Sequence, residues 1–447
     1  MLTKFLSLLL SILSVLTFGP LSKYDYSDKL GNADYTGLKE YYADYFDIGA
    51  AVGGWHCKNG DYAAFIRKNY SSLTAENAFK QPAINPSEGV WNFAEADTIA
   101  DFCRENGLKL RGHCLVWGGL GSWMSRNSDG SLVSKEVYYE RLRNYLSVIM
   151  PRYGDIVSVW DVVNEPFGYD RKDGEFKDND LYRICGEEYI TKAFEIAHEV
   201  DPSAKLCLNE CKVVNNNTKQ KYLLKYLEKW LDEGVPIHAV GIQGHWSTFE
   251  INESPRRLQK VIDKLYKLGV DIQVTEVDME VTADKSEMFD VVPKNAELLQ
   301  SKKYSQMFEV LRKNADKISS VTFWGVNDNR PITGEDGKVY YPSQLLFTKD
   351  NMPKNAFYAV CDFEPAGGGQ SDIKGADSNE EANRVTAEFV QKESVAIDTP
   401  TADFAAGMPN TQIVTVNGMP RLSIDGRLTS PVLFFGNTDF DNPNGAS

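Results

Sequence analysis

Eight short stretches rich in aliphatic and β-branched residues recur along the chain, and each is followed by a polar loop and a segment with helical periodicity. This repetition constrains the fold strongly, because eight strand–helix units are typical of a closed parallel barrel. We therefore predict an α/β fold, a (β/α)8 TIM barrel. The predicted strands are Asp47–Val52, Ser71–Thr74, Lys109–Arg111, Val157–Val163, Lys205–Leu208, Ala239–Ile242, Asp271–Thr275 and Ser320–Phe323.

Helix-boundary residues support this count. The segment from Asp97 to Gly107 begins with a residue that caps helices and ends at a glycine that can adopt the left-handed C-terminal conformation. The segment Tyr304–Asn314 gathers four apolar side chains on one face and precedes the eighth strand. Both segments are predicted to be helices of the barrel.

The chain has 447 residues, and an α/β barrel commonly takes about 250 or more as one unit. We predict that residues 23–363 form the barrel domain. Residues 364–405 are an acidic, glycine-containing linker that could include one surface helix. Residues 406–447 contain the turn dipeptides Asn417-Gly418 and Asp425-Gly426, which predict a short β-hairpin extension. Because about forty residues bury little core, this part is expected to be the incomplete start of a second, β-rich domain.

The N-terminus has the pattern of a secretory signal. Lys4 precedes an apolar stretch from Phe5 to Phe18, and the helix-breaking pair Gly19-Pro20 follows. A membrane span needs about 20 apolar residues, so an uncleaved anchor is the less favoured alternative. We predict a signal peptide over residues 1–22 and a secreted protein with no membrane association after cleavage.

Charge and composition narrow the partners. The net charge of −15 argues against nucleic acid and anionic lipid, since both require a clustered cationic surface. The 22 Tyr, 22 Phe and 8 Trp provide ring faces on which sugars stack, although most aromatic residues simply fill cores. Seven cysteines without a CxxC pair predict neither a metal site nor a redox motif, and their odd number leaves at least one thiol free within a monomer. We expect a monomer without a cofactor.

Polar side chains lie just beyond the predicted strands, at the barrel end where active sites form. These residues are Glu76, Asn77, Lys80, His113, Trp117, Asn164, Glu165, Asn209, Gln243, His245, Glu276, Asp278 and Trp324. Side chains alternate across a strand, so Asp161 shares a face with Glu165 and supports the same row.

Two glutamates on opposite strands are what glycoside hydrolysis requires, because one carboxyl protonates the departing oxygen while the other attacks or activates water. Glu165 and Glu276 occupy such positions. His245 could orient Glu276, and Asp278 could hold the histidine. A lone glutamate is usually a surface carboxylate, and His113 alone would be read as a core imidazole. It is the joint placement of these residues at strand ends that favours a sugar site.

The motifs resemble those of family 10 glycoside hydrolases, the retaining endo-β-1,4-xylanases. The matching segments run in family order across roughly residues 45 to 361. They are Leu73–Lys80, Arg111–Trp117, Trp160–Pro166, Val240–His245, Val274–Asp278 and Val321–Val326.

The resemblance implies a role for each matching residue. Glu165 would be the acid/base and Glu276 the nucleophile, with Asn164 on the 2-hydroxyl of the sugar being cleaved. It also implies that the non-reducing side is held by Glu76, Asn77 and Lys80, and that the cleaved sugar is walled by His113, Trp117, Gln243 and Trp324. His245 and Asp278 would support the nucleophile, and xylan would be the substrate.

Departures from the family pattern cluster around this centre. Gly118, Gly119 and Leu120 replace a His, a small polar residue and a Gln, which removes a sugar contact on the reducing side. Glu210 and Cys211 replace an Asp and a Tyr after the fifth strand, which removes an aromatic ring near the leaving group. A second expected tryptophan is Ile332. Preferred chain length and decoration are therefore expected to differ from the family norm.

Two alternative functions remain open from the sequence. One is a retaining hydrolase of another β-1,4-glycan, such as cellulose or mixed-linkage glucan, which Leu120 and Cys211 would permit. The other is a barrel that binds xylan without cleaving it, although the presence of both glutamates disfavours that reading.

Overall fold

The computed structural model describes residues 21–363, apart from 119–121, 171, 283–290 and 334–337, together with residues 411–416, 419–424 and 427–428. The chain divides into two compact units, Met1–Gln370 and Ser371–Ser447. Most of the predicted signal peptide, the predicted linker and its helix, both turn dipeptides, Gly119 and Leu120 lie outside the described residues. The predicted domain boundaries stay predictions.

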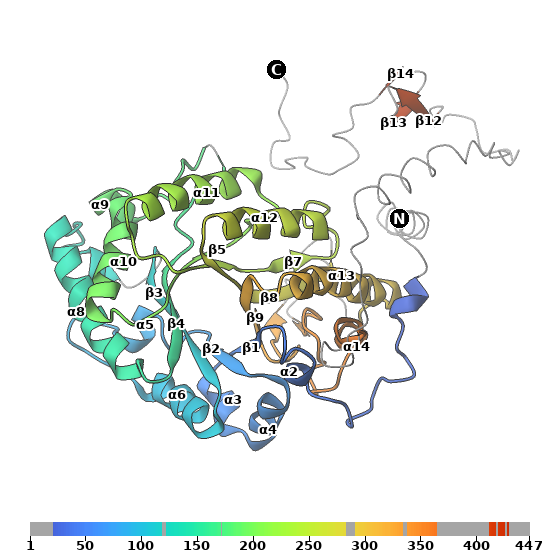
Figure 1. The fold of residues 1–447 in the computed structure, drawn as a ribbon, viewed down its shortest axis with the longest axis horizontal. Coiled ribbons are helices and arrows are strands. Elements are labelled where there is room, and N and C mark those ends of the chain that lie inside the picture. The colour runs from blue at the N-terminus through green and yellow to red at the C-terminus, as the bar shows by residue number, and fades with distance from the viewer. Residues whose placement is uncertain are drawn as a thin grey trace, which may run out of the picture. The chain divides into compact units, whose positions relative to one another are not determined.

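Eight parallel strands close into a barrel, with β1 joined to β9 and β6 joined to β8 (Figure 1). The TIM barrel predicted from the sequence is therefore confirmed. The barrel strands are β1 Asp47–Val52, β2 Ser72–Ala75, β3 Lys109–Trp117, β4 Val157–Asn164, β5 Leu206–Glu210, β6 Ala239–Ile242, β8 Asp271–Glu280 and β9 Ile318–Phe323. Short strands β7 His245–Ser247, β10 Ile332–Thr333 and β11 Val339–Tyr340 lie in the loops, and β7 pairs with β8.

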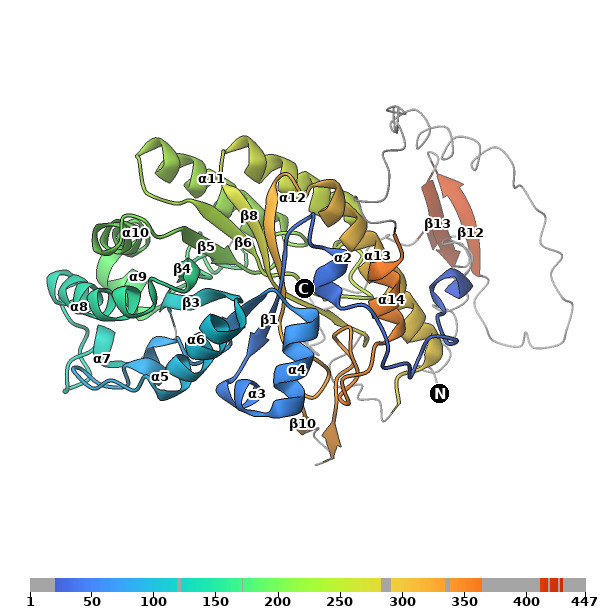
Figure 2. The same ribbon diagram turned by 60° about the horizontal axis from the view of Figure 1, so that its bottom comes forward.

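Helices surround the barrel, as Figure 2 shows from a second direction. They are η1 Leu21–Tyr24, α2 Leu38–Tyr41, α3 Gly54–Lys58, α4 Gly60–Asn69, α5 Gln81–Ile84, α6 Ala94–Asn106, α7 Ser122–Ser125, α8 Lys135–Tyr153, α9 Asp180–Cys185, α10 Glu188–Val200, α11 Asn217–Asp232, α12 Pro255–Lys267, α13 Lys294–Lys313 and α14 Asn355–Cys361.

Helix α12 illustrates why these segments are helical. The side chain of Ser254 accepts a hydrogen bond from the backbone of Arg257, and Pro255 occupies the first turn, where its missing N–H is not needed. Its four buried residues recur at helical spacing on the side facing the barrel: Leu258, Val261, Ile262 and Leu265. This apolar stripe fixes the helix on the sheet.

The predicted N-cap of α6 was wrong by four residues, because the cap is Phe93. The helix begins at Ala94, and Asp97 lies inside it rather than at its cap. Asp97 instead accepts hydrogen bonds from Arg152 and Tyr153 on α8. The predicted end is confirmed, because Gly107 adopts the left-handed conformation with φ 63°. The helix predicted over Tyr304–Asn314 is the second half of α13.

Close packing fixes one glycine of the barrel. A Cβ atom on Gly112 in β3 would lie 2.1 Å from the ring of Trp160 on β4. Trp160 is 1% exposed, so its ring has no free space into which to move. Glycine is thus required where these two strands bring the tryptophan against the backbone.

The second unit contains β12 Thr411–Val416, β13 Met419–Ile424 and β14 Arg427–Leu428, which pair antiparallel in chain order. The hairpin pairings predicted around the two turn dipeptides are confirmed by this register.

All seven cysteines are free thiols. Among the helices that the structure describes, none combines the length and the apolar character needed to cross a bilayer.

Candidate active site

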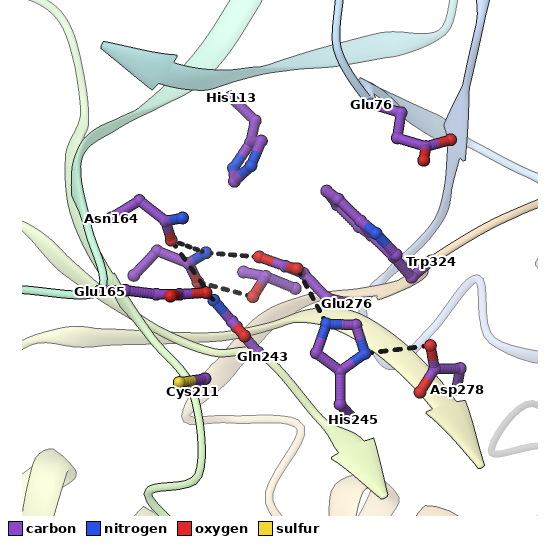
Figure 3. A network of polar contacts seen from close by, with 12 residues as sticks. Glu76, His113, Asn164, Glu165, Cys211, Gln243, His245, Glu276, Asp278 and Trp324 are labelled. Carbon is purple, nitrogen blue, oxygen red and sulfur yellow. Dashed lines mark hydrogen bonds and ion pairs between the residues drawn. The ribbon is translucent and has the colours of Figure 1, made fainter. Parts of the chain in front are cut away.

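The two predicted catalytic glutamates occupy the carboxyl ends of strands on different sides of the barrel. Glu165 directly follows β4, and Glu276 lies within β8. Figure 3 shows their carboxylates facing one space, together with Asn164, Gln243 and His245. Glu276 is 4% exposed, so its charge depends on the partners described below.

Glu165 has a backbone conformation that non-glycine residues seldom adopt, with φ 54°. Its N–H donates to the carbonyl oxygen of Asn209 on β5 over 2.9 Å, which anchors the turn. Gln243 Nε2 donates to Glu165 Oε1 over 2.9 Å, and Lys177 Nζ donates to Glu165 Oε2 over 2.6 Å. Both carboxylate oxygens are therefore held, and an observed backbone outlier at this position is typical of a functional site.

The electrostatic setting of Glu165 differs from what an acid requires. Burial acts to raise the pKa of Glu165, but the charge and hydrogen bond of Lys177, the hydrogen bond of Gln243 and the charge of Lys219 hold it below its ordinary value. The requirement for a protonated carboxyl is not met in this arrangement. Of these partners, Lys177 lowers the pKa of Glu165 most, so its removal would raise that pKa most.

Glu276 accepts hydrogen bonds at both oxygens. Asn209 Nδ2 donates to its Oε1 over 2.7 Å, and His245 Nε2 lies 3.1 Å from its Oε2. The other imidazole nitrogen, Nδ1, lies 3.0 Å from Asp278 Oδ2. Burial acts to lower the pKa of His245, but Asp278 and Glu276 outweigh it and raise the pKa to about 10. The imidazole of His245 thus bridges Asp278 and Glu276 and orients the Glu276 carboxylate.

Asn209 connects the two halves of the site. Its Nδ2 also donates to Asn164 Oδ1 over 2.9 Å, while its own Oδ1 accepts from Thr275 Oγ1 over 2.7 Å. Gln243 Nε2 approaches the same Asn164 oxygen at 3.4 Å. Since the oxygen of Asn164 is occupied, its amide N–H groups are the part able to donate to a ligand.

His113 and Trp324 line the site beyond Glu276. Their rings meet edge to face with centroids 5.2 Å apart, and His245 contacts Trp324 from another side at 6.2 Å. His113 Nδ1 lies 2.9 Å from Asp161 Oδ2, and Arg111 Nη2 donates to Asp161 Oδ1 over 2.8 Å. Burial opposes ionisation of Asp161, but Arg111 and His113 bring its pKa down to about 2. Asp161 therefore fixes the orientation of the His113 ring through its contact with Nδ1.

The predicted set Glu76, Asn77 and Lys80 lies after β2 and is linked by side-chain contacts. Lys80 Nζ donates to Asn77 Oδ1 over 3.0 Å and lies 5.3 Å from the centre of the Trp117 ring. Glu76 Oε1 accepts from Arg330 Nη2 over 2.6 Å. In Figure 3 Glu76 lies on the far side of Trp324 from Glu165.

Four contacting residues were missed from the sequence: Arg111, Lys177, Thr275 and Arg330. Arg111 lies on a predicted strand with the parity of His113, which was the available signal. Thr275 has the opposite parity to Glu276, and only the register shift between Val274 and Val277 lets both contact the site. Lys177 and Arg330 lie in irregular loops, where no periodicity indicates which way a side chain points.

A cavity of about 410 Å³ opens beside Glu165. Its lining residues are Trp117, Gly118, Glu165, Tyr169, Asp173, Lys177, Asp178 and Asn179. Behind it, Glu210 and Lys219 form a fully buried ion pair beside Cys211. Ile332, at the expected second tryptophan, is 38% exposed in β10. Among the described residues, no cluster of His, Cys, Asp and Glu side chains is arranged to hold a metal ion.

A parallel barrel that presents two carboxylates of unlike surroundings at the carboxyl ends of its strands defines an enzyme of the glycoside hydrolase class. One carboxylate has an imidazole and an amide as partners, and the other has an amide and a lysine. Such a pair can divide the nucleophilic and proton-transfer roles between its members.

Comparison with known proteins identifies the family. Residues 37–363 match glycosyl hydrolase family 10. A β-1,4-xylanase of Dictyoglomus thermophilum is 37% identical over 372 residues, covering 81% of this chain and 100% of that protein. An endo-1,4-β-xylanase/feruloyl esterase of Xylanibacter ruminicola is 35% identical over 349 residues, covering 74% of this chain and 47% of that protein, so this chain spans about half of that relative.

Solved structures of related sequence share the fold of this chain. A mutant protein in complex with xylotriose is 36% identical, with a TM-score of 0.69, and the match covers 74% of this chain and 100% of that one. The chain belongs to glycosyl hydrolase family 10, which confirms the resemblance seen in its motifs.

Proposed function

We propose that this protein is a secreted endo-β-1,4-xylanase that cleaves internal xylosidic bonds with retention of configuration by double displacement. The observation that carries the proposal is the contrast between Glu276, which is held by Asn209 and His245, and Glu165, which is held by Gln243 and Lys177. The names of its relatives, which include xylanases, support the choice of xylan.

In the first step, Glu276 attacks the anomeric carbon and forms a covalent glycosyl–enzyme bond while Glu165 protonates the departing glycosidic oxygen. His245 and Asn209 suit Glu276 to this role, because their contacts with its two carboxylate oxygens hold it in one orientation. In the second step, water attacks the same carbon. Glu165 accepts the proton of that water, and Glu276 is released.

Glu165 must bind a proton before it can donate one, which requires Lys177 to leave its carboxylate. Lys177 lines the cavity beside Glu165, so a sugar entering on the leaving-group side would compete for its ammonium group. We propose that this competition couples occupation of the leaving-group side to protonation of the acid.

The remaining residues would bind the sugars. Asn164 would donate to the 2-hydroxyl of the cleaved sugar, because its oxygen is already occupied. We assign the non-reducing side to Glu76, Asn77 and Lys80, of which Glu76 lies across Trp324 from Glu165 in Figure 3. The cleaved sugar would lie against His113, Trp117, Gln243 and Trp324.

The test is digestion of soluble xylan by the purified protein, followed by NMR spectroscopy of the first products. The proposal predicts oligosaccharides of several lengths whose new reducing ends are initially β. Initially α products would exclude retention. A faster initial rate on β-glucan than on xylan would favour the other substrate class, and binding without products would favour a non-catalytic barrel.

A further inference from the structure

We infer that Tyr169 is the stacking surface for the sugar on the leaving-group side, and that it is supplied by the β4–α9 loop in place of the aromatic residue absent at Cys211. The inference rests on the proposed function and concerns its selectivity. It explains why the loop after β4 carries an exposed ring beside the acid.

Tyr169 is exposed and yet held in place. Its side chain is 42% exposed and lines the cavity that contains Glu165 and Lys177. Its N–H donates to Asp173 Oδ2 over 3.0 Å, and its carbonyl oxygen accepts from Asn216 Nδ2 over 2.8 Å. A ring fixed on both sides of its backbone can stack on a sugar without first losing much freedom.

The inner side of this ring is covered by a buried cation. Lys219 Nζ lies 3.9 Å from the ring centre, and its distance to Glu210 Oε1 is 2.8 Å. Lys219 and Glu210 are both 0% exposed. Because Lys219 is fully buried, its ammonium contacts the buried side of the ring. The exposed remainder lines the cavity, where Lys177 Nζ lies 5.2 Å from the ring centre and would have to give way to a sugar. Cation–π attraction is strong when the cation is desolvated, so Lys219 fixes the tilt of Tyr169.

Cys211 completes the support. The hydroxyl of Tyr169 lies 3.5 Å from Cys211 Sγ, and Lys219 Nζ lies 2.8 Å from the same sulfur. Burial and the charge of Glu210 raise the pKa of the Cys211 thiol to about 11, so it is neutral at ordinary pH. A larger side chain at position 211 would compete for the space that the tyrosine hydroxyl reaches. The small thiol and the inward-reaching tyrosine are therefore complementary.

The lining of the cavity indicates what it accepts. Three carboxylates line the cavity against one ammonium, that of Lys177, and this excess of negative charge disfavours an acidic sugar. The carboxylates belong to Glu165, Asp173 and Asp178. Asn179 contributes an amide to the lining. This amide packs against the backbone of Gly118, where a Cβ atom would lie 2.3 Å from its Nδ2. A flat ring with neighbouring hydrogen-bonding groups suits a neutral pyranose. We therefore assign the cavity to an unmodified or neutrally substituted xylose.

The test compares two substrates that differ on the leaving-group side. Xylotetraose places sugar units on the leaving-group side. In β-xylobiosyl fluoride the leaving group is a single fluorine atom, which departs as fluoride and cannot contact Tyr169. For Tyr169→Ala, the ratio of kcat/KM on xylotetraose to kcat/KM on the fluoride should fall about 10-fold relative to wild type. Tyr169→Phe keeps the ring and should stay within about 2-fold of the wild-type ratio, since a 3.5 Å contact to sulfur contributes little.

Tyr266→Ala is the matched control. Tyr266 is also an exposed tyrosine with a lysine over its ring, Lys317 at 5.3 Å, but it lies near the end of α12, at the opposite end of the barrel. For Tyr266→Ala, the ratio of kcat/KM on xylotetraose to kcat/KM on the fluoride should equal that of wild type. Equal losses of Tyr169→Ala on both substrates, or none on either, would overturn the inference. Failure of the wild-type protein to cleave either substrate would instead overturn the proposed function.

Discussion

Lys177 Nζ and Glu165 Oε2 form an ion pair of 2.6 Å in the lining of the cavity of about 410 Å³. The lysine comes from the loop after β4, twelve residues beyond the glutamate. It binds the same carboxylate that the proposed mechanism requires to be protonated. This single contact therefore relates the ionisation of the acid to what occupies the cavity.

Removing Lys177 should shift the pH profile. The lysine stabilises ionised Glu165, so Lys177→Met raises the pKa of Glu165 and extends its protonated range. The basic limb of kcat/KM against pH should move to higher pH by about one unit or less, given the partial exposure of the pair. Lys172→Met, an exposed lysine of the same loop, should leave the limb in place. A limb that stays fixed or moves to lower pH in Lys177→Met would contradict this role.

His245 should make the stability of the protein depend on pH. Its folded pKa of about 10 exceeds its ordinary value of 6.5, so its contribution is fully present below pH 6.5 and is lost as the pH rises through 10. The difference in unfolding free energy between wild type and His245→Asn should therefore narrow from pH 6.5 to pH 10. Urea denaturation at several pH values measures it. A difference independent of pH would show that folding does not raise the pKa of His245.

The buried pair of Arg111 and Asp161 predicts a large loss of stability when one partner is removed. Asp161→Ala leaves the Arg111 charge buried and should reduce the unfolding free energy by about 3–5 kcal/mol. Asp155→Ala breaks the exposed pair with Arg104 and should cost about 1 kcal/mol or less. Chemical denaturation compares the two variants. Similar losses of unfolding free energy in the two variants would contradict full burial of the Arg111–Asp161 pair.

Asn209 should affect turnover more than substrate binding. Asn209→Ala removes the donor to Glu276 Oε1 and the link to Asn164, and should lower kcat about 100-fold. Thr275→Ala removes only the hydrogen bond that orients Asn209, so its loss should be smaller, about 3- to 10-fold. Steady-state kinetics on xylo-oligosaccharides give both values. Wild-type kcat in Asn209→Ala would exclude a role for this amide.

Much of this architecture is predictable because it depends on periodicity. Each strand of the barrel needs a buried aliphatic run and each helix an apolar stripe, so their order is visible in the sequence, as β1 and β6 illustrate with the predicted bounds. The ends of β3 and β8 were placed too early. Both strands continue past register shifts, between His113 and Val116 and between Val274 and Val277, and such bulges interrupt simple alternation.

The candidate site divides in the same way. Side chains such as Gln243 and Glu276 lie at the carboxyl ends of strands. Because these ends meet on one side of a parallel barrel, the barrel itself brings the two side chains together. Lys177 and Tyr169 reach the site from a loop whose path depends on tertiary contacts, including the hydrogen bond from Asn216. No spacing in the sequence encodes that path. The sequence therefore does not indicate that Lys177 lowers the pKa of Glu165.

Trapping the covalent intermediate tests the central claim most directly. A 2-deoxy-2-fluoro xylobioside with a good leaving group slows hydrolysis of the glycosyl–enzyme more than its formation, so the sugar stays attached for peptide mass spectrometry. We predict one sugar per protein molecule, bound through an ester to Glu276. Labelling of Glu165 or another carboxylate, or hydrolysis of the reagent with immediate inversion and no labelled peptide, would contradict the account.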